Sequence, residues 1–185
     1  MKKIAKSLLE WLIIIAVAFV LSLVIRNYLI DTRIVPSSSM LPTIQLQDRL
    51  LVDRIFYKFD TIRRGDILTF KAPPGVKKDE DLVKRVIGLP GEKLQIKNGK
   101  VYINDKVLNE PYIEHPADYE FGPVTVPANS YFMMGDNRPI SLDSHIWGAL
   151  PTNYLLGRVW IRYWPLGNFG ALTKLPVDYP VGTVQ

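Results

Sequence analysis

Hydrophobic residues are spread unevenly along this chain, and the longest apolar run lies near its N-terminal end. Several lysines precede residues 11–25, a stretch that contains no charged residue. With its apolar flanks, the stretch reaches the roughly 20 residues that a membrane-spanning helix needs. Trp11 and Tyr28 are spaced like the two aromatic belts of such a helix. Residues 8–30 are therefore predicted to form a transmembrane helix.

The same run could also be a cleaved signal peptide or a buried core helix. A signal peptide has a shorter apolar region followed by a small-residue cleavage site, whereas the only Ala-x-Ala sequence, Ala16 to Ala18, lies inside the run. An uncleaved anchor is the better interpretation. The N-terminal lysines favour a cytoplasmic N-terminus, although Arg26 and Arg33 on the other flank weaken the bias. The expected division is a cytoplasmic tail, a single-pass anchor in the cell membrane and an extracytoplasmic domain, over residues 1–7, 8–30 and 31–185.

From residue 46 onward the apolar positions form short runs separated by turn residues, the pattern of β-strands. The expected strands cover residues 50–52, 66–70, 82–87, 93–96, 100–103, 124–126, 131–134 and 158–163. Asn98-Gly99 suits the type I′ turn of a β-hairpin. No long amphipathic helix follows the N-terminal run, so the fold class is predicted to be mainly β.

Two stretches of this domain lack the strand pattern. Residues 71–81, which contain Pro73-Pro74-Gly75 and mixed charges, are expected to form an exposed loop between two strands. Residues 109–123 are expected to form an irregular, proline-containing excursion on the surface. Neither stretch is long enough to fold as a separate domain.

The composition excludes several kinds of site. Among its 185 residues the chain has no cysteine and two histidines, His115 and His145. Disulfides, thiol nucleophiles and zinc–thiolate sites are therefore excluded. Two histidines also leave few candidate residues for a histidine metal site or for a Ser-His-Asp triad. The net charge of +5 comes from scattered basic residues, which disfavours nucleic acid as a partner and favours contact with anionic lipid. We expect no metal and no cofactor.

A serine near the predicted membrane and a lysine in an apolar run are candidates for hydrolytic chemistry. Ser39 lies between Pro36 and Pro42, and Lys84 lies among apolar residues of the stretch 82–88. Burial disfavours the ammonium form of a lysine and lowers its pKa, so that it can serve as base for a serine. The alternatives are a polar linker for residues 37–39 and an exposed edge-strand position for Lys84. The large apolar residues that follow Ser39 argue against a linker.

The ordered motifs of the chain resemble those of the type I signal peptidases, membrane-bound serine proteases that remove signal peptides from exported proteins. The resemblance reaches from the predicted anchor to about Pro165 and rests on residues 36–43, 64–67, 84–92 and 135–144. It implies an antiparallel β-sheet catalytic domain of the signal-peptidase and LexA-like kind. In this family the nucleophile precedes a methionine, which matches Ser39, and the general base matches Lys84. The Ser39 backbone N–H and the Ser37 hydroxyl would form the oxyanion hole.

The resemblance also implies supporting residues. Ser141 matches a serine that hydrogen-bonds the lysine and orients it, and Asp143 and Arg138 would buttress the site through ion pairs. His145 stands where the family commonly has arginine. A histidine could still pair with Asp143, in a pair whose charge varies with pH. Cyanobacterial and thylakoid members of the family often carry histidine there, so the residue hints at lineage and a thylakoid membrane becomes an alternative location.

The resemblance implies a substrate as well, a preprotein whose signal peptide ends in an Ala-x-Ala pattern. Shallow apolar pockets would select the small residues, and the substrate would bind as an added strand. Candidates for the pocket lining are Val35, Met40, Ile44 and Val83. Aromatic residues near Pro165 would pack in the core or rest on membrane lipid.

Two other interpretations compete with this membrane-anchored endopeptidase. A self-cleaving Ser-Lys protease of the LexA type would need a DNA-binding helical domain, but an anchor is predicted in its place. A catalytically inactive, membrane-anchored binding module of the same fold is the remaining alternative. The complete set of Ser39, Lys84 and Ser141 argues against it.

Overall fold

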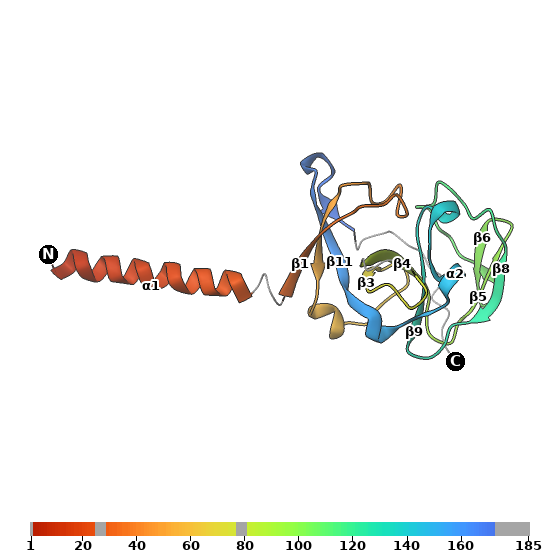
Figure 1. Cartoon of the computed structure of the whole chain (residues 1–185), viewed down its shortest axis with the longest axis horizontal. Coiled ribbons are helices and arrows are strands. Elements are labelled where there is room, and N and C mark those ends of the chain that lie inside the picture. The colour runs from red at the N-terminus through yellow and green to blue at the C-terminus, as the bar shows by residue number, and fades with distance from the viewer. Residues whose placement is uncertain (1, 25–28, 77–80, 173–185) are drawn as a thin grey trace.

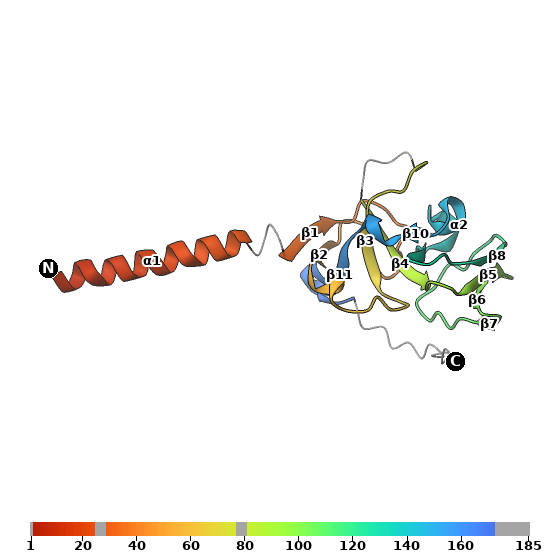
Figure 2. The same ribbon diagram turned by 90° about the horizontal axis from the view of Figure 1, so that it is seen from below.

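The computed structural model describes residues 2–24, 29–76 and 81–172. A long helix, α1 (Lys2–Val24), extends away from a domain built almost entirely of strands (Figures 1 and 2). Within the described residues, no helix combines the length and the apolar character that crossing a bilayer requires. The predicted anchor over residues 8–30 therefore stays a prediction, and part of it, residues 25–28, lies outside the described residues. Its last residue, Ile30, belongs to a strand.

The larger sheet has eight strands, in the order β1-β2-β11-β3-β4-β9-β10, with β12 paired to β11. All of its pairs are antiparallel. Its strands are β1 (Ile30–Ile34), β2 (Arg49–Asp53), β3 (Ile67–Phe70), β4 (Leu82–Gly88), β9 (Ser130–Met134), β10 (Leu150–Pro151), β11 (Leu155–Trp164) and β12 (Gly170–Ala171). The expected mainly β, antiparallel fold is confirmed.

The smaller sheet has four strands in the order β7-β6-β5-β8 and lies on the side of the domain far from α1 (Figure 1). Its strands are β5 (Lys93–Lys97), β6 (Lys100–Ile103), β7 (Lys106–Val107) and β8 (Phe121–Thr125). Asn98 and Gly99, which join β5 to β6, both have positive φ angles, of 51° and 73°. A type I′ turn needs positive φ at both central positions, so the predicted hairpin is confirmed.

Each predicted strand has a counterpart in the structure, but β1 and the two-residue strands β7, β10 and β12 were not predicted. β1 pairs with β2 in the register Ile30 to Asp53 and Ile34 to Arg49. The three central residues of β1, Asp31 to Arg33, are all polar, all five residues are half-buried or exposed, and the strand follows the long apolar run closely. Because β1 and β2 are neighbours, the segment that contains Ser39 is the connection of a β-hairpin.

The short helical elements lie in the connections between strands. They are the α-helix α2 (Ser144–Trp147) and the 3-10 turns η2 (Phe56–Lys58), η3 (Arg138–Ile140), η4 (Thr152–Tyr154) and η5 (Leu166–Asn168). Both η3 and α2 follow β9 and thus lie in the segment that carries Ser141 and Asp143.

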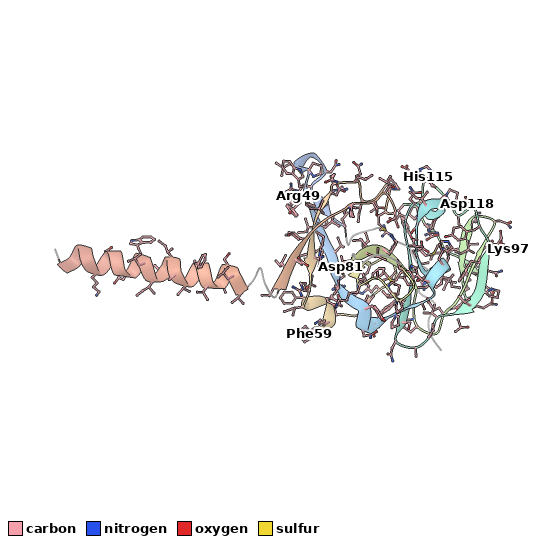
Figure 3. The ribbon with its side chains drawn as sticks, in the orientation of Figure 1. Arg49, Phe59, Asp81, Lys97, His115 and Asp118 are labelled. Carbon is pink, nitrogen blue, oxygen red and sulfur yellow. The ribbon has the colours of Figure 1, made fainter. Side chains whose placement is uncertain are left out.

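The two irregular stretches have different outcomes. Residues 77–80 of the predicted 71–81 loop lie outside the described residues, and residues 71–76 form neither helix nor strand. The expectation that residues 109–123 form an irregular surface excursion is wrong in part, because residues 121–123 belong to β8. His115 and Asp118 do point outward (Figure 3), but Tyr112 and Ala117 are buried against the core of the smaller sheet. The apolar side chains of this stretch are spaced too irregularly to predict that burial.

Candidate active site

The connection between β1 and β2 folds back on itself and presents Ser39. The backbone N–H of Val35 donates to the carbonyl of Asp48 over 3.0 Å, and that of Gln47 donates back to Val35 over 2.9 Å. These bonds continue the β1–β2 ladder across the base of the connection. Met40 and Ile44 anchor the turn from inside, because both side chains are almost fully buried. Ser39 therefore precedes a residue that is fixed in the core.

Lys84 approaches Ser39 from the centre of β4. It lies opposite Leu68 of β3, and only 3% of its surface is exposed. Its Nζ lies 2.7 Å from the Oγ of Ser39, within hydrogen-bond distance. The edge-strand alternative for Lys84 is excluded, because β4 has β3 on one side and β9 on the other.

Two further serines lie at this pair. The Oγ of Ser37 lies 3.3 Å from the Oγ of Ser39. Ser141 is buried, but its Oγ has no hydrogen-bond partner among the described residues, so the expected hydrogen bond to Lys84 is not formed in this structure. Ser141 is nevertheless close to Ser39, because a Cβ added to Gly135 would come within 2.2 Å of the Ser141 Oγ and within 2.4 Å of the Ser39 carbonyl oxygen.

Asp143 and His145 form the expected pair at the start of α2. The Nδ1 of His145 lies 2.7 Å from the Oδ1 of Asp143, and the Asp143 side chain also caps α2. The His145 ring stacks on Tyr119 at a centroid distance of 4.0 Å. The Oδ2 of Asp143 accepts the Gly135 N–H over 3.0 Å. Burial, and after it the charge of Asp143, raises the pKa of Tyr119 above its usual range.

Comparison with known proteins places the chain in a family. A family model described as signal peptidase, peptidase S26, matches residues 8–164. The chain belongs to this family of signal peptidases. A signal peptidase I from Leptolyngbya laminosa is 44% identical over 179 residues, which cover 94% of this chain and 88% of the relative. A probable signal peptidase I-2 from Synechocystis sp. is 43% identical, with 84% of this chain and 73% of the relative covered.

A plant protein is also similar to this chain. A protein from Arabidopsis thaliana with the name probable thylakoidal processing peptidase 2, chloroplastic, is 39% identical over 153 residues. These residues cover 80% of this chain and 42% of the relative. The predicted resemblance to type I signal peptidases, including cyanobacterial and thylakoid members, is thus confirmed.

In this member of the signal peptidase family, Arg138 does not pair with Asp143. Its guanidinium instead contacts the carboxylate of Glu110, with the nearest N–O distance at 2.5 Å. Its Nε donates to the carbonyl of Gly135 over 3.0 Å. Arg138 and Asp143 therefore hold Gly135 from two sides, Arg138 at its carbonyl and Asp143 at its N–H.

Sequence reasoning missed a buried ion pair behind the site, between Arg85 and Asp136. The Nη2 of Arg85 lies 2.5 Å from the Oδ2 of Asp136, and both side chains are fully buried. The Thr43 hydroxyl donates to the same carboxylate over 2.5 Å. This contact ties the Ser39 connection to β4 and to the end of β9. The signal was the alternation along β4, which places Arg85 on the face opposite Lys84, where it too is buried.

The four candidates for the substrate pocket come together in one apolar cluster. Val35, Met40 and Ile44 are buried, and Val83 is partly buried against them. The cluster continues into the core under β2 and β11, with Leu50, Val52, Ile67 and Val159 as its other buried members. Of the candidates, only Val83, next to Lys84 on β4, keeps substantial exposure.

The described residues contain no group of three or more histidine, aspartate or glutamate side chains arranged to hold a metal ion.

Proposed function

We propose that this member of the signal peptidase family is a membrane-anchored endopeptidase that cleaves signal peptides from exported preproteins, with Ser39 as nucleophile and Lys84 as general base. The observation that carries the proposal is the 2.7 Å separation of Lys84 Nζ and Ser39 Oγ in a buried setting. A hydroxyl and an amine at this distance can exchange a proton directly.

The proposed reaction has two stages. Neutral Lys84 takes the Ser39 proton while the Ser39 oxygen attacks the scissile carbonyl carbon, and the resulting ammonium gives that proton to the leaving amine. The signal peptide is then held as an ester on Ser39. In the second stage Lys84 takes a proton from water, the hydroxide attacks the ester, and the proton returns to the departing Ser39 oxygen.

The proposal requires the amine of Lys84 to be neutral before it accepts the Ser39 proton. With 3% of its surface exposed, Lys84 has little water around it to stabilise an ammonium ion. Burial of this kind favours the neutral form. Val86, two residues on in β4 and on the same face of the strand by alternation, is fully buried and apolar.

Two donors beside Ser39 would stabilise the oxyanion of the tetrahedral intermediate. They are the Ser39 backbone N–H and the hydroxyl of Ser37, whose oxygen lies 3.3 Å from the Ser39 Oγ. A carbonyl carbon attacked by Ser39 would bring its oxygen within reach of the Ser37 hydroxyl. Each such donor contributes on the order of 3 kcal/mol to the stabilisation of a developing oxyanion.

We further propose that the substrate binds as an extended strand with its small residues on the cluster of Val35, Met40, Ile44 and Val83. Three of these side chains are already packed against one another, which leaves little depth for a large substrate side chain. Such a surface accepts alanine and rejects bulkier residues. This accounts for selection of an Ala-x-Ala-like sequence before the cut.

The anchor is proposed over residues 8–30, in a plasma or thylakoid membrane, with the N-terminus in the cytoplasm. The apolar side chains of α1 from Trp11 to Val24 have no protein surface over them, and the large ones are between 42% and 64% exposed. Lipid would cover them. Because Ile30 already belongs to β1, removal of residues 1–28 keeps the β-domain whole. That deletion should abolish sedimentation with membranes. Unchanged sedimentation would refute the anchor.

The test of the proposed function is cleavage of a purified preprotein by the full chain in detergent. Mass spectrometry of the products should locate one cut, directly after an Ala-x-Ala-like sequence. Ser39→Ala should give no product while its unfolding midpoint stays close to that of the wild type. Binding of the preprotein by the wild type without cleavage would instead favour an inactive binding module.

A further inference from the structure

The stretch from Glu110 to Tyr112 forms a buried contact with the segment that follows β9. Tyr112 is 7% exposed, and the Glu110 side chain is 9% exposed. Both residues come from the connection between β7 and β8 in the smaller sheet. The outer part of the same connection carries exposed residues such as His115 (Figure 3). The inner part therefore faces the larger sheet, where the reaction is proposed to occur.

Glu110 grips Arg138 with both carboxylate oxygens. The Nη2 and Nη1 of Arg138 lie 2.5 Å and 3.1 Å from Oε1 and Oε2 of Glu110. Such a two-point contact fixes orientation as well as distance. Burial is the largest single influence on the pKa of Arg138 and lowers it, but the charge and hydrogen bond of Glu110, together with the charges of Tyr112 and Asp136, raise that pKa above its ordinary value. The carboxylate of Glu110 therefore stabilises the guanidinium of Arg138 in the interior.

Arg138 in turn holds the backbone beside Ser39. Its Nε donates to the carbonyl of Gly135 over 3.0 Å. Gly135 approaches Ser39 so closely that an added Cβ would come within 2.4 Å of the Ser39 carbonyl oxygen. Asn137, which lies between Gly135 and Arg138 in the sequence, donates its backbone N–H to the same Ser39 oxygen over 3.1 Å. Its side-chain N–H donates to the Ser38 carbonyl over 3.3 Å. The segment from Gly135 to Arg138 therefore fixes the backbone of the proposed nucleophile.

Tyr112 connects Glu110 to a second part of the site. Its hydroxyl donates to Oε1 of Glu110 over 2.8 Å. The Cζ of the Arg85 guanidinium lies over the Tyr112 ring, 4.0 Å from the ring centroid. Arg85 is the residue next to Lys84, and its side chain holds Asp136. The stretch from Glu110 to Tyr112 thus contacts both Arg138, which holds the backbone beside Ser39, and Arg85, which follows Lys84 in the sequence.

We propose that Glu110 is a positioning residue, which acts through Arg138 and the backbone of Gly135 to hold Ser39 at reacting distance from Lys84. Glu110 does not touch the substrate or the reacting atoms. Its contribution is to the geometry in which the proton is transferred, so its loss should lower the rate of the chemical step and leave substrate binding nearly unchanged. The inference rests on the proposed function, because it gives Glu110 a part in the reaction of Ser39.

The test compares four variants of the full chain in detergent on a peptide with an Ala-x-Ala site: Glu110→Gln, Glu110→Asp, Tyr112→Phe and Glu114→Gln. Glu110→Gln should lower kcat on the order of 10- to 100-fold, the cost of a misplacement of about 1 Å, with KM within twofold of the wild type. Glu110→Asp, which keeps the charge, should recover part of the rate, and Tyr112→Phe should give a smaller decrease. Glu114→Gln removes the same charge from an exposed position in the same connection and should leave kcat unchanged.

The rates are measured well below the unfolding midpoint of each variant and divided by the concentration of folded protein, so that a purely structural role would leave kcat unaltered. An unchanged kcat for folded Glu110→Gln overturns the proposal. If Glu110→Gln does not fold, Tyr112→Phe decides by the same criterion. Ser39→Ala is measured in the same assay. Activity of Ser39→Ala would refute the proposed function itself. If Ser39→Ala is inactive while Glu110→Gln is fully active, only the positioning role of Glu110 is refuted.

Discussion

The Nζ of Lys84 lies 2.7 Å from the Oγ of Ser39, although 45 positions separate the two residues in the sequence. The two residues are therefore brought together by the tertiary structure and not by a local turn. Lys84 is fixed by β4, which is central in the larger sheet, and Ser39 by a hairpin connection whose next residue, Met40, is buried. Three layers of contact maintain this distance: the close approach of Gly135, the buried pair of Arg85 and Asp136, and the grip of Glu110 on Arg138.

Gly135→Ala should disable the site. Its Cβ would come within 2.2 Å of the Ser141 Oγ and within 2.4 Å of the Ser39 carbonyl oxygen, so the backbone of Ser39 must move. We expect a decrease in kcat/KM on the order of 100-fold and a loss of about 1–3 kcal/mol in the free energy of unfolding. The matched control is Gly167→Ala, since nothing lies within 4 Å of a Cβ there. Similar activity in the two variants would contradict the packing described for Ser39.

Asp136→Ala should be one of the most destabilising single changes in the domain. It leaves the guanidinium of Arg85 buried without its carboxylate, and breaking a buried pair in this way costs about 3–5 kcal/mol. Asp105→Asn is the control, because it removes a carboxylate charge 2.8 Å from Lys93 where the side chains of Asp105 and Lys93 are 72% and 46% exposed, and asparagine tolerates the positive φ of 66° at this position. Urea unfolding should show a change within about 1 kcal/mol for Asp105→Asn. Equal changes for the two variants would show that Asp136 has no special role.

Tyr119→Phe should stabilise the protein, and the advantage should grow in alkali. The Tyr119 hydroxyl is buried without a hydrogen-bond partner among the described residues, so removing it should leave the unfolding free energy at pH 7 unchanged or raise it by about 1 kcal/mol. The folded-state pKa of Tyr119 is raised above the unfolded value of about 10. The stability linked to its neutral form is therefore complete below pH 10 and is lost as the pH rises further.

Urea unfolding of the wild type and of Tyr119→Phe at pH 7 and near pH 10.5 checks this prediction. Ionisation of the other tyrosines is common to both proteins, so the difference between them isolates the Tyr119 hydroxyl. A Tyr119→Phe variant that is less stable than the wild type at both pH values would mean that the hydroxyl has a favourable contact.

Activity should rise with pH, because only the neutral amine of Lys84 can accept the Ser39 proton. His145→Arg should leave this rise in place, since an arginine can also pair with Asp143 and His145 lies outside the proposed proton path. Measurement of kcat/KM from pH 6 to pH 10 for both proteins checks this. A rising limb that moves or disappears in His145→Arg would show that the imidazole, and not the lysine, sets the pH dependence.

The strands of this fold could be predicted from the sequence because their apolar residues occur in short runs between turn residues. The hairpin at Asn98-Gly99 was predictable for the same local reason, as positive φ angles suit these residues. β1 could not be predicted in this way. Its first residue, Ile30, continues the long apolar run, and only its pairing with Asp53 of β2 makes it a strand.

The residues proposed for the reaction could be selected from their motifs, but most of their support could not. The roles of Arg85 and Glu110 depend on contacts between segments that are distant in the sequence, 51 positions for Arg85 and Asp136 and 28 for Arg138 and Glu110. The sequence alone does not distinguish a buried arginine from an exposed one. For Ser141 the motif predicted a hydrogen bond to Lys84, which is not formed in this structure.

The most direct test of the account is the rate of preprotein cleavage by purified Lys84→Ala, measured beside Lys93→Ala and the double variant Ser39→Ala/Lys84→Ala. Lys93 is a lysine of β5 whose side chain is 46% exposed, so its removal should leave the rate near that of the wild type. Lys84→Ala should show no detectable cleavage while staying folded, and the double variant should be no worse than either single variant, because the two residues act as a unit. Substantial cleavage by Lys84→Ala would contradict the assignment of Lys84 as the base for Ser39.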